Sequence, residues 1–160
     1  MNDAPVTLLV VDDEEAIRKS MRKYLTLQGY EVATAASGEE ALGVIGRQKV
    51  AGMLLDVNMP GISGVDLVPR ILELEPNMAI LMLTAVNDAT SAALCMQRGA
   101  LDYLIKPVDL THLSRAIQSA LQKRHTVLEG QQINQWLKEE VALRVAEKRL
   151  EQAESSARGF

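Results

Sequence analysis

Four consecutive acidic residues follow an apolar run near the N-terminus, in the stretch LLVVDDEE at residues 8–15. Two carboxylates about 4 Å apart repel each other by about 4 kcal/mol at the effective dielectric constant of a protein surface. Such a cluster is stable when its members spread into water or when a cation holds them together. The other polar residues that end apolar runs decide between these two possibilities.

Asp56, Thr84 and Lys106 each stand at the end of a further aliphatic run, as Asp12 and Asp13 do after the first. In open parallel sheets, ligands bind beyond the carboxyl ends of the strands, so these five side chains are predicted to meet at one edge. Any one of them could be a turn or helix-cap residue. A turn or cap role does not explain why five such residues would meet at the same edge.

The predicted edge has the chemistry of a phosphoryl-transfer site. Its three acids supply the oxygen ligands that Mg²⁺ takes together with water and phosphate oxygens. A bound metal would offset their repulsion and keep one carboxylate ionised and nucleophilic. Lys106 and Thr84 would then match the remaining phosphoryl oxygens with a cation and a hydroxyl donor. The acids are therefore interpreted as a site for a divalent cation.

The elements that must position these residues alternate between two sequence patterns. Short aliphatic runs suit strands buried on both faces, and the segments between them carry apolar residues at helical spacing. The alternation predicts an α/β fold with a doubly wound parallel sheet. The five predicted strands are Thr7–Val11, Glu31–Ala35, Ala51–Leu55, Met78–Leu83 and Tyr103–Ile105.

Helix boundaries are marked by local signals. Ser37 with Glu40 three residues later forms a capping-box pattern at the start of the second predicted helix. Gly29 and Gly99 are predicted to end the first and fourth helices. From about His125 the chain has no strand-like run, so the sequence divides into a domain of residues 1–124 and a helical tail of residues 125–160.

Composition excludes several classes of function. The 160 residues are 48% hydrophobic and carry a formal charge of −4, without the basic patch that nucleic acids or anionic membranes require. Cys95 is the single cysteine, which excludes an internal disulfide and fits a reducing compartment. The N-terminal apolar run is too short for a signal peptide or a membrane span. We expect a cytoplasmic protein that binds neither nucleic acid nor membrane.

Four motifs in order resemble the receiver domain of two-component response regulators, the CheY-like family. They are VVDDEE (residues 10–15), LLDVNMPGISG (54–64), LTA (83–85) and GALDYLIKP (99–107), and the likeness covers residues 6 to about 123. The resemblance implies a five-stranded, flavodoxin-like sheet with strand order 2-1-3-4-5. It also implies a signalling phosphoacceptor that is not an enzyme acting on external substrates.

The resemblance also implies a role for each matching residue. Asp56 resembles the phosphoacceptor, which takes its phosphoryl group from a sensor histidine kinase, a phosphotransfer protein or a small phosphodonor. The remaining roles are Mg²⁺ binding by Asp12, Asp13, Asp56 and the backbone carbonyl of Asn58, switching by Thr84 and the aromatic Tyr103, a salt bridge from Lys106, and a cis peptide bond before Pro107. Residues 88–121 are then the surface expected to change on phosphorylation and to form a homodimer.

The tail allows two interpretations. Trp136, Leu143 and Leu150 repeat every seven residues, whereas a second set from Ile133 to Val145 repeats every four, so no single heptad seam emerges. A solvated helix that continues the last helix of the domain is one interpretation, and a parallel dimeric coiled coil is the other. The tail loosely resembles linkers to HD-GYP phosphodiesterase domains. The chain is therefore expected either to be a fragment with a missing output domain or to act through partners.

Two rival functions are weaker. A Mg²⁺-dependent phosphohydrolase with an aspartyl-phosphate intermediate would carry a second acid two residues after the nucleophile, where this chain has Asn58. A flavodoxin-like carrier would place a Ser/Thr/Gly phosphate loop after the first strand, where this chain has acids.

Overall fold

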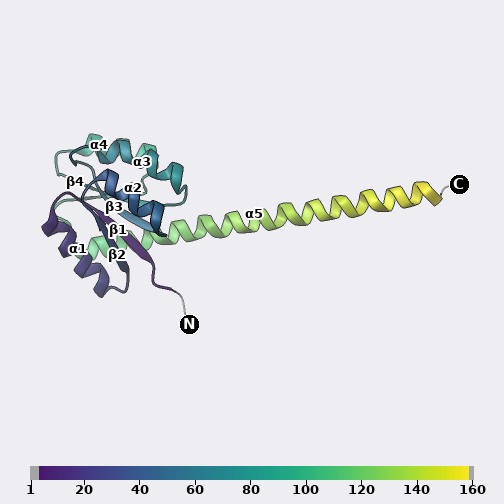
Figure 1. The fold of residues 1–160 in the computed structure, drawn as a ribbon, viewed down its shortest axis with the longest axis horizontal. Helices are drawn as coiled ribbons and strands as arrows, with labels where there is room; N and C mark the ends of the chain where they lie inside the picture. Colours follow the sequence, from purple (N-terminus) through teal and green to yellow (C-terminus); the bar gives the residue numbers. More distant parts are fainter. Residues whose placement is uncertain (1–3, 159–160) are drawn as a thin grey trace. The chain divides into compact units, whose positions relative to one another are not determined.

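Strands and helices alternate along residues 4–158, the residues that the computed structural model describes (Figure 1). The strands are β1 (Thr7–Val11), β2 (Glu31–Ala35), β3 (Gly52–Asp56), β4 (Ala79–Thr84) and β5 (Asp102–Ile105). The helices are α1 (Glu15–Leu27), α2 (Gly38–Arg47), α3 (Gly64–Leu74), α4 (Ala89–Arg98) and α5 (Leu110–Arg158). All strand pairs are parallel in the order β2-β1-β3-β4-β5, which confirms the doubly wound α/β prediction.

Three predicted strands are shifted or extended by one residue. The predictions for β3 and β4 began and ended one residue too early, and the prediction for β5 began one residue too late. The ladder continues into the polar residues, because Asp56 pairs with Leu83 and Thr84 pairs with Ile105. Two of the predicted site residues are therefore the last residues of their strands, with backbones held by the sheet.

The sheet is buried on both faces, as the continuous apolar runs predict. Alternate residues of β1 point to opposite sides: Leu9 and Val11 join one core cluster, and Leu8 and Val10 join the other. Helices α2, α3 and α4 supply the first cluster, and α1 with the first part of α5 supplies the second. This three-layer arrangement covers both faces of the sheet and leaves the ends of the strands open to a ligand.

The predicted cap of α2 is present, with one change of partner. The Ser37 hydroxyl accepts a hydrogen bond from the Glu40 N–H at 3.2 Å. The Glu40 carboxylate accepts from the N–H of Ala36, at 3.0 Å, instead of from the capping residue itself. Gly29 and Gly99 end α1 and α4 with positive φ angles, as predicted.

Helix α3 contains Pro69, which has no N–H to donate to the carbonyl of Val65 one turn earlier. Arg98 at the end of α4 donates to that carbonyl from Nη1 at 3.0 Å. The same nitrogen lies 3.2 Å from Asp66 Oδ1. The proline thus leaves an acceptor free in α3, and a side chain of the neighbouring helix satisfies it.

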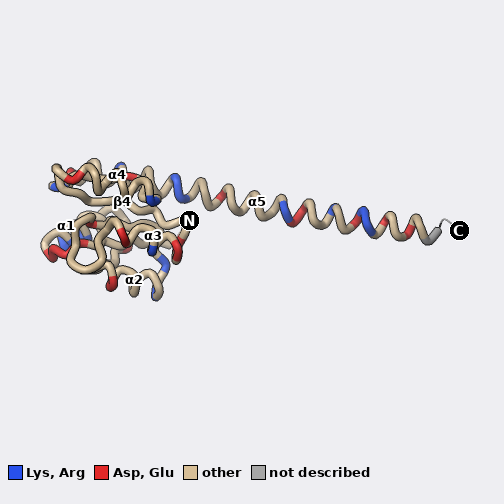
Figure 2. The backbone as a smooth tube through the Cα atoms, turned by 90° about the horizontal axis from the view of Figure 1, so that it is seen from above, with Lys and Arg blue, Asp and Glu red and all other residues tan. Residues whose placement is uncertain are grey.

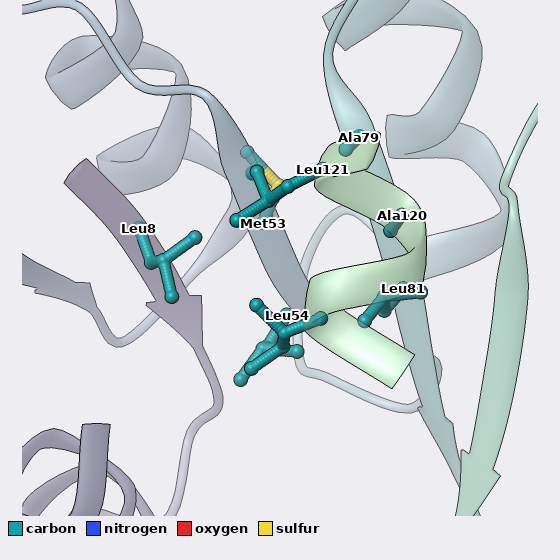
Figure 3. A pocket seen from close by; sticks show the side chains of 9 residues that line it. Leu8, Met53, Leu54, Ala79, Leu81, Ala120 and Leu121 are labelled. Atoms are coloured by element: carbon teal, nitrogen blue, oxygen red, sulfur yellow. The ribbon is translucent and has the colours of Figure 1, made fainter. Parts of the chain in front are cut away.

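The first part of α5 packs over the strands at the amino end of the sheet (Figure 3). Gly52 begins β3 there, and a Cβ at this position would lie 3.0 Å from Leu8 Cδ2 and 3.5 Å from Leu121 Cδ2. A cavity of about 10 Å³ lies among these residues. This is the lower limit for one water molecule, and its apolar lining offers no partners for one.

The contacts divide the chain into two units, one ending at Arg124 and the other beginning at His125. In the second unit α5 exposes most of its apolar side chains, including Ile133, Trp136, Val141, Leu143 and Leu150. Figure 2 shows that both acidic and basic residues are distributed along this segment. Within residues 4–158, no helix is long and apolar enough to cross a membrane.

Candidate functional site

The carboxyl edge of the sheet brings together the residues that the sequence singled out. Asp12 and Asp13 follow β1, Asp56 ends β3, and Lys106 follows β5. Asp12, Asp13 and Asp56 each offer a carboxylate oxygen, and these oxygens all lie within 4.8 Å of one another. Asp12 and Asp56 are buried, whereas Asp13 is exposed, so the cluster opens to solvent on one side.

Lys106 is the cation of this cluster. Its Nζ lies 2.8 Å from Asp12 Oδ2 and 3.3 Å from Asp56 Oδ2. The ammonium therefore links the acid that follows β1 to the acid that ends β3. The peptide bond between Lys106 and Pro107 is cis. Three carboxylates against one ammonium leave the edge with unbalanced negative charge, which a divalent cation would offset.

Asp56 has an unusual protonation equilibrium. Burial raises the pKa of its carboxyl, and the nearby charge of Asp12 raises it further, to about 6. Lys106 and the N–H of Asn58, which donates to Oδ1 at 3.2 Å, act in the opposite direction. The carboxylate therefore carries a free-energy cost of ionisation that a positive ligand would relieve.

Lys106 is held in its charged form by the same acids. Burial alone would lower the pKa of Lys106, but the hydrogen bond to Asp12 and the charges of Asp56 and Asp12 outweigh it. The pKa of Lys106 therefore lies above its ordinary value. The ammonium is a permanent donor at this edge.

The Thr84 hydroxyl is buried but weakly bonded. It donates at 3.4 Å to the carbonyl of Ala85 and at 3.3 Å to the carbonyl of Asp88, both long for an O–H donor. The hydroxyl can therefore reorient at low cost toward a better acceptor.

Asp88 and Arg18 were not identified from the sequence. The Asp88 carboxylate accepts from the Asn58 side chain at 3.2 Å, which ties the loop after β3 to the start of α4. Hydrogen bonds from Ser91 and Asn58 lower the pKa of Asp88. Arg18 donates to the backbone carbonyl of Asp12 at 2.6 Å. No local pattern marks either residue, because both act on groups that the fold brings close.

Gly64 is a third site residue without a sequence signal for its role. A Cβ at this first position of α3 would lie 2.5 Å from the Asp56 carbonyl oxygen and 2.8 Å from Val57 Cα. Its N–H donates to the Val57 carbonyl at 2.9 Å. The loop after Asp56 can fold back tightly only because residue 64 has no side chain.

Tyr103 lies on β5, outside the hydrogen-bonded cluster. Its side chain is 41% exposed, and its backbone N–H is bonded to the Asp102 carboxylate at 2.8 Å. The structure brings Asp12, Asp13, Asp56 and Lys106 together in one cluster. The N–H of Asn58 bonds to Asp56, whereas the Thr84 hydroxyl bonds to the backbone of Ala85 and Asp88.

Comparison with known proteins decides the family. Residues 8–118 match the response regulator receiver domain, which is more than half of the chain. The chain belongs to the response regulator receiver domain family. Residues 4–124 are called the receiver below, and residues 125–158 the tail.

Three similar proteins illustrate the family. The probable transcriptional regulator ycf27 of Cyanidium caldarium is 41% identical over 119 residues, 74% of this chain and 47% of that protein. A cyclic di-GMP phosphodiesterase of Thermotoga maritima is 36% identical over 119 residues, 74% of this chain and 32% of that protein. A receiver domain protein of Clostridium thermocellum superimposes with a TM-score of 0.73 at 35% identity, covering 76% of this chain and 98% of that one.

The receiver is one part of most of these relatives. The aligned region spans between 28% and 52% of the length of the similar curated proteins. These relatives include transcriptional regulators and a cyclic di-GMP phosphodiesterase. Similar receivers therefore occur in proteins with different activities.

Proposed function

We propose that this receiver is a phosphorylation-dependent switch in which Asp56 accepts a phosphoryl group from a histidine kinase, a phosphotransfer protein or a small phosphodonor. The observation that carries the proposal is the cluster of Asp12, Asp13 and Asp56 around Lys106 at the carboxyl edge of the sheet. Family membership makes phosphoacceptance the expected activity of such a cluster.

In the proposed step, a carboxylate oxygen of Asp56 bonds to the phosphorus of the donor. The bond from that phosphorus to a histidine nitrogen or an acetyl phosphate oxygen breaks, and its electron pair leaves with the donor. The sheet fixes the Asp56 backbone, and the Asn58 N–H holds one carboxylate oxygen at 3.2 Å. Lys106 would stabilise the added negative charge from a position already 3.3 Å from Asp56.

Asp12, Asp13 and Asp56, with the backbone carbonyl of Asn58, would hold Mg²⁺. The three carboxylates are close enough for one ion, and their unbalanced charge suits a divalent cation. Bound Mg²⁺ would neutralise charge on the phosphoryl oxygens. The raised pKa of Asp56 supports this assignment, because the protein alone does not fully stabilise the ionised carboxylate.

The switch would begin at Thr84. Its weak bonds to Ala85 and Asp88 would be exchanged for a bond to a phosphoryl oxygen, which moves the start of α4. Tyr103, now partly exposed, would turn inward to fill the released space. The conformer stabilised by phosphorylation would then change the surface of residues 88–121.

That surface, or the tail, would pair with a second copy and control an output domain or partner. A phosphodiesterase and transcriptional regulators among the relatives support an attached output as the simplest arrangement. The chain's own chemistry would be limited to gaining and losing the phosphoryl group. A cytoplasmic location, where a kinase domain and Mg²⁺ would both be available, stays a prediction.

Intact-mass measurement after incubation with acetyl phosphate and Mg²⁺ tests the proposal. We expect one phosphoryl adduct on the parent chain, none on Asp56→Asn and none in EDTA. Asp102→Asn is the matched control, because Asp102 is exposed on β5 and an asparagine can still accept from the Tyr103 N–H. An adduct that survives Asp56→Asn would refute the assignment of the acceptor, and turnover of an external phosphate ester would favour a phosphohydrolase.

A further inference from the structure

The tail carries two apolar stripes on different sides of α5. Trp136, Leu143 and Leu150 repeat every seven residues, which shifts a side chain by only about −20° around a straight helix. The second stripe, from Ile133 to Val145, repeats every four residues and turns by about +40° at each step. Only the first stripe stays on one line that a second helix could follow by supercoiling.

We propose that Trp136, Leu143 and Leu150 occupy the a positions of a short, parallel, two-stranded coiled coil between two copies of this chain. The side chains of these residues are exposed along the described tail, at 60%, 61% and 66%. The d positions then fall on Glu139, Ala146 and Ala153, of which the last two are small and apolar. Two copies would bury the large a residues against one another with alanines between them.

The charges beside this seam favour a second copy in parallel orientation. The e positions are Glu140, Glu147 and Glu154, and the g positions include Arg149. In a parallel pair each g residue faces the partner's next e residue, so Arg149 of each copy faces Glu154 of the partner. In an antiparallel pair e faces e, which would place Glu140 against Glu147 across the seam. Parallel pairing therefore gains the Arg149–Glu154 attraction twice by symmetry and avoids the contact between Glu140 and Glu147. Its cost is the first d position, where Glu139 faces Glu139 of the partner copy.

The seam is short, with three large a residues, and would be weak alone. Its closure on phosphorylation rests on the proposed function: receivers that pair would hold two tails at an effective concentration in the millimolar range. The seam itself, its residues and its orientation are independent of phosphorylation.

Single cysteines test the seam and its direction. The parent's only cysteine, Cys95, is buried, so the parent is the background control. We expect Trp136→Cys and Leu150→Cys each to form disulfide-linked dimers under mild oxidation at high protein concentration. Val141→Cys lies on the second stripe and is the matched control, because Val141 is also exposed in the tail and should give several-fold less dimer.

Each outcome decides the proposal. Crosslinking of the Trp136→Cys and Leu150→Cys chains only when mixed would show antiparallel pairing and overturn the orientation. Equal or stronger crosslinking through Val141→Cys would overturn the choice of stripe. No crosslinking at any position would overturn the pairing of copies and leave the stripe to a different partner.

Trp136 also provides a signal in the parent chain, since it is the only tryptophan. Burial in the seam should shift its emission to shorter wavelength as protein concentration rises. Beryllofluoride with Mg²⁺ should move this shift to lower concentration in the parent and not in Asp56→Asn. A shift that ignores beryllofluoride would retain the seam and remove its link to the proposed function, so the two can fail separately.

Discussion

The last segment of the receiver and the whole tail share one helix, α5, yet the two parts of this helix have different surroundings. In the receiver, Leu113 and Ile117 of α5 are buried against the sheet. In the tail, Trp136, Leu143 and Leu150 of the same helix contact mainly solvent. The receiver part of α5 is therefore stabilised by tertiary packing, whereas the tail part depends on the helix propensities of its residues and on partners.

The largest expected effect comes from one substitution made in both parts of α5. Leu113→Ala should lower the free energy of unfolding of the receiver by about 3 kcal/mol, because it removes a fully buried side chain. Leu143→Ala should change it by less than about 0.5 kcal/mol, since the side chain is exposed. Urea unfolding of both variants at low protein concentration makes the comparison. A cost at position 143 like that at 113 would show that the tail packs as part of the receiver's core.

The pH dependence of the free energy of unfolding should differ between the acidic site of the receiver and the exposed acids of the tail. The folded state raises the pKa of Asp56 from 3.8 to about 6, so it binds this proton more tightly than the unfolded chain does. The associated stabilisation is present below pH 3.8 and is lost as the pH rises through 6. Without Mg²⁺, Asp56→Asn should therefore be more stable than the parent by about 2–3 kcal/mol above pH 7, with the gain vanishing near pH 4.

Unfolding in urea across this pH range, with EDTA present, measures the difference. Glu151→Gln, an exposed change in the tail, is the control and should follow the parent at every pH. A gain for Asp56→Asn that does not depend on pH would contradict the raised pKa as its cause.

A matched pair of glycines tests how tightly the site is packed. Gly64→Ala should cost about 2 kcal/mol or more and impair phosphorylation, because its Cβ would overlap the backbone of Asp56 and Val57. Gly52→Ala meets the flexible end of Leu8 beside a small cavity, so its cost should stay below about 1 kcal/mol. Thermal unfolding with the acetyl phosphate assay distinguishes them, and equal effects would show that the loop after Asp56 can yield.

The smallest expected effect concerns Pro69 and Arg98. Arg98→Met should cost about 1 kcal/mol, because the Val65 carbonyl loses the donor that replaces the missing N–H of Pro69. In a Pro69→Ala background the helix can supply that donor, so the same change should cost less. A double-mutant cycle by urea unfolding measures the coupling, and additive effects would show that Arg98 acts only through its surface pair with Asp66.

The receiver fold was predictable because stretches of buried apolar residues recur along the sequence in patterns typical of strands and helices. Continuous aliphatic runs gave the strands, and the polar residues at their ends gave one edge. The one-residue extension of the ladder to Asp56 and Thr84 was missed, since polar residues end an apolar pattern without ending the hydrogen bonds. Secondary structure follows backbone pairing, and side-chain polarity tracks it only approximately.

The supporting residues of the site were not predictable from local pattern. Asn58 and Asp88 are thirty residues apart, and their hydrogen bond exists only after β3 and β4 pair. The constraint at Gly64 depends on a contact with backbone, which leaves no trace in hydrophobicity or charge. In the tail, the sequence revealed both stripes, but choosing the first one needed the rotation of each stripe around the helix, and its orientation needed the charges beside it.

Strand β3 runs directly between the two ends of the receiver's sheet. It carries Asp56 at its carboxyl end and Gly52 at its amino end, where Gly52 and Leu121 of α5 line the same small cavity. Four steps along a strand cover about 13 Å. A displacement of Asp56 along the strand axis would therefore reach the cavity under α5 through one stiff segment of backbone.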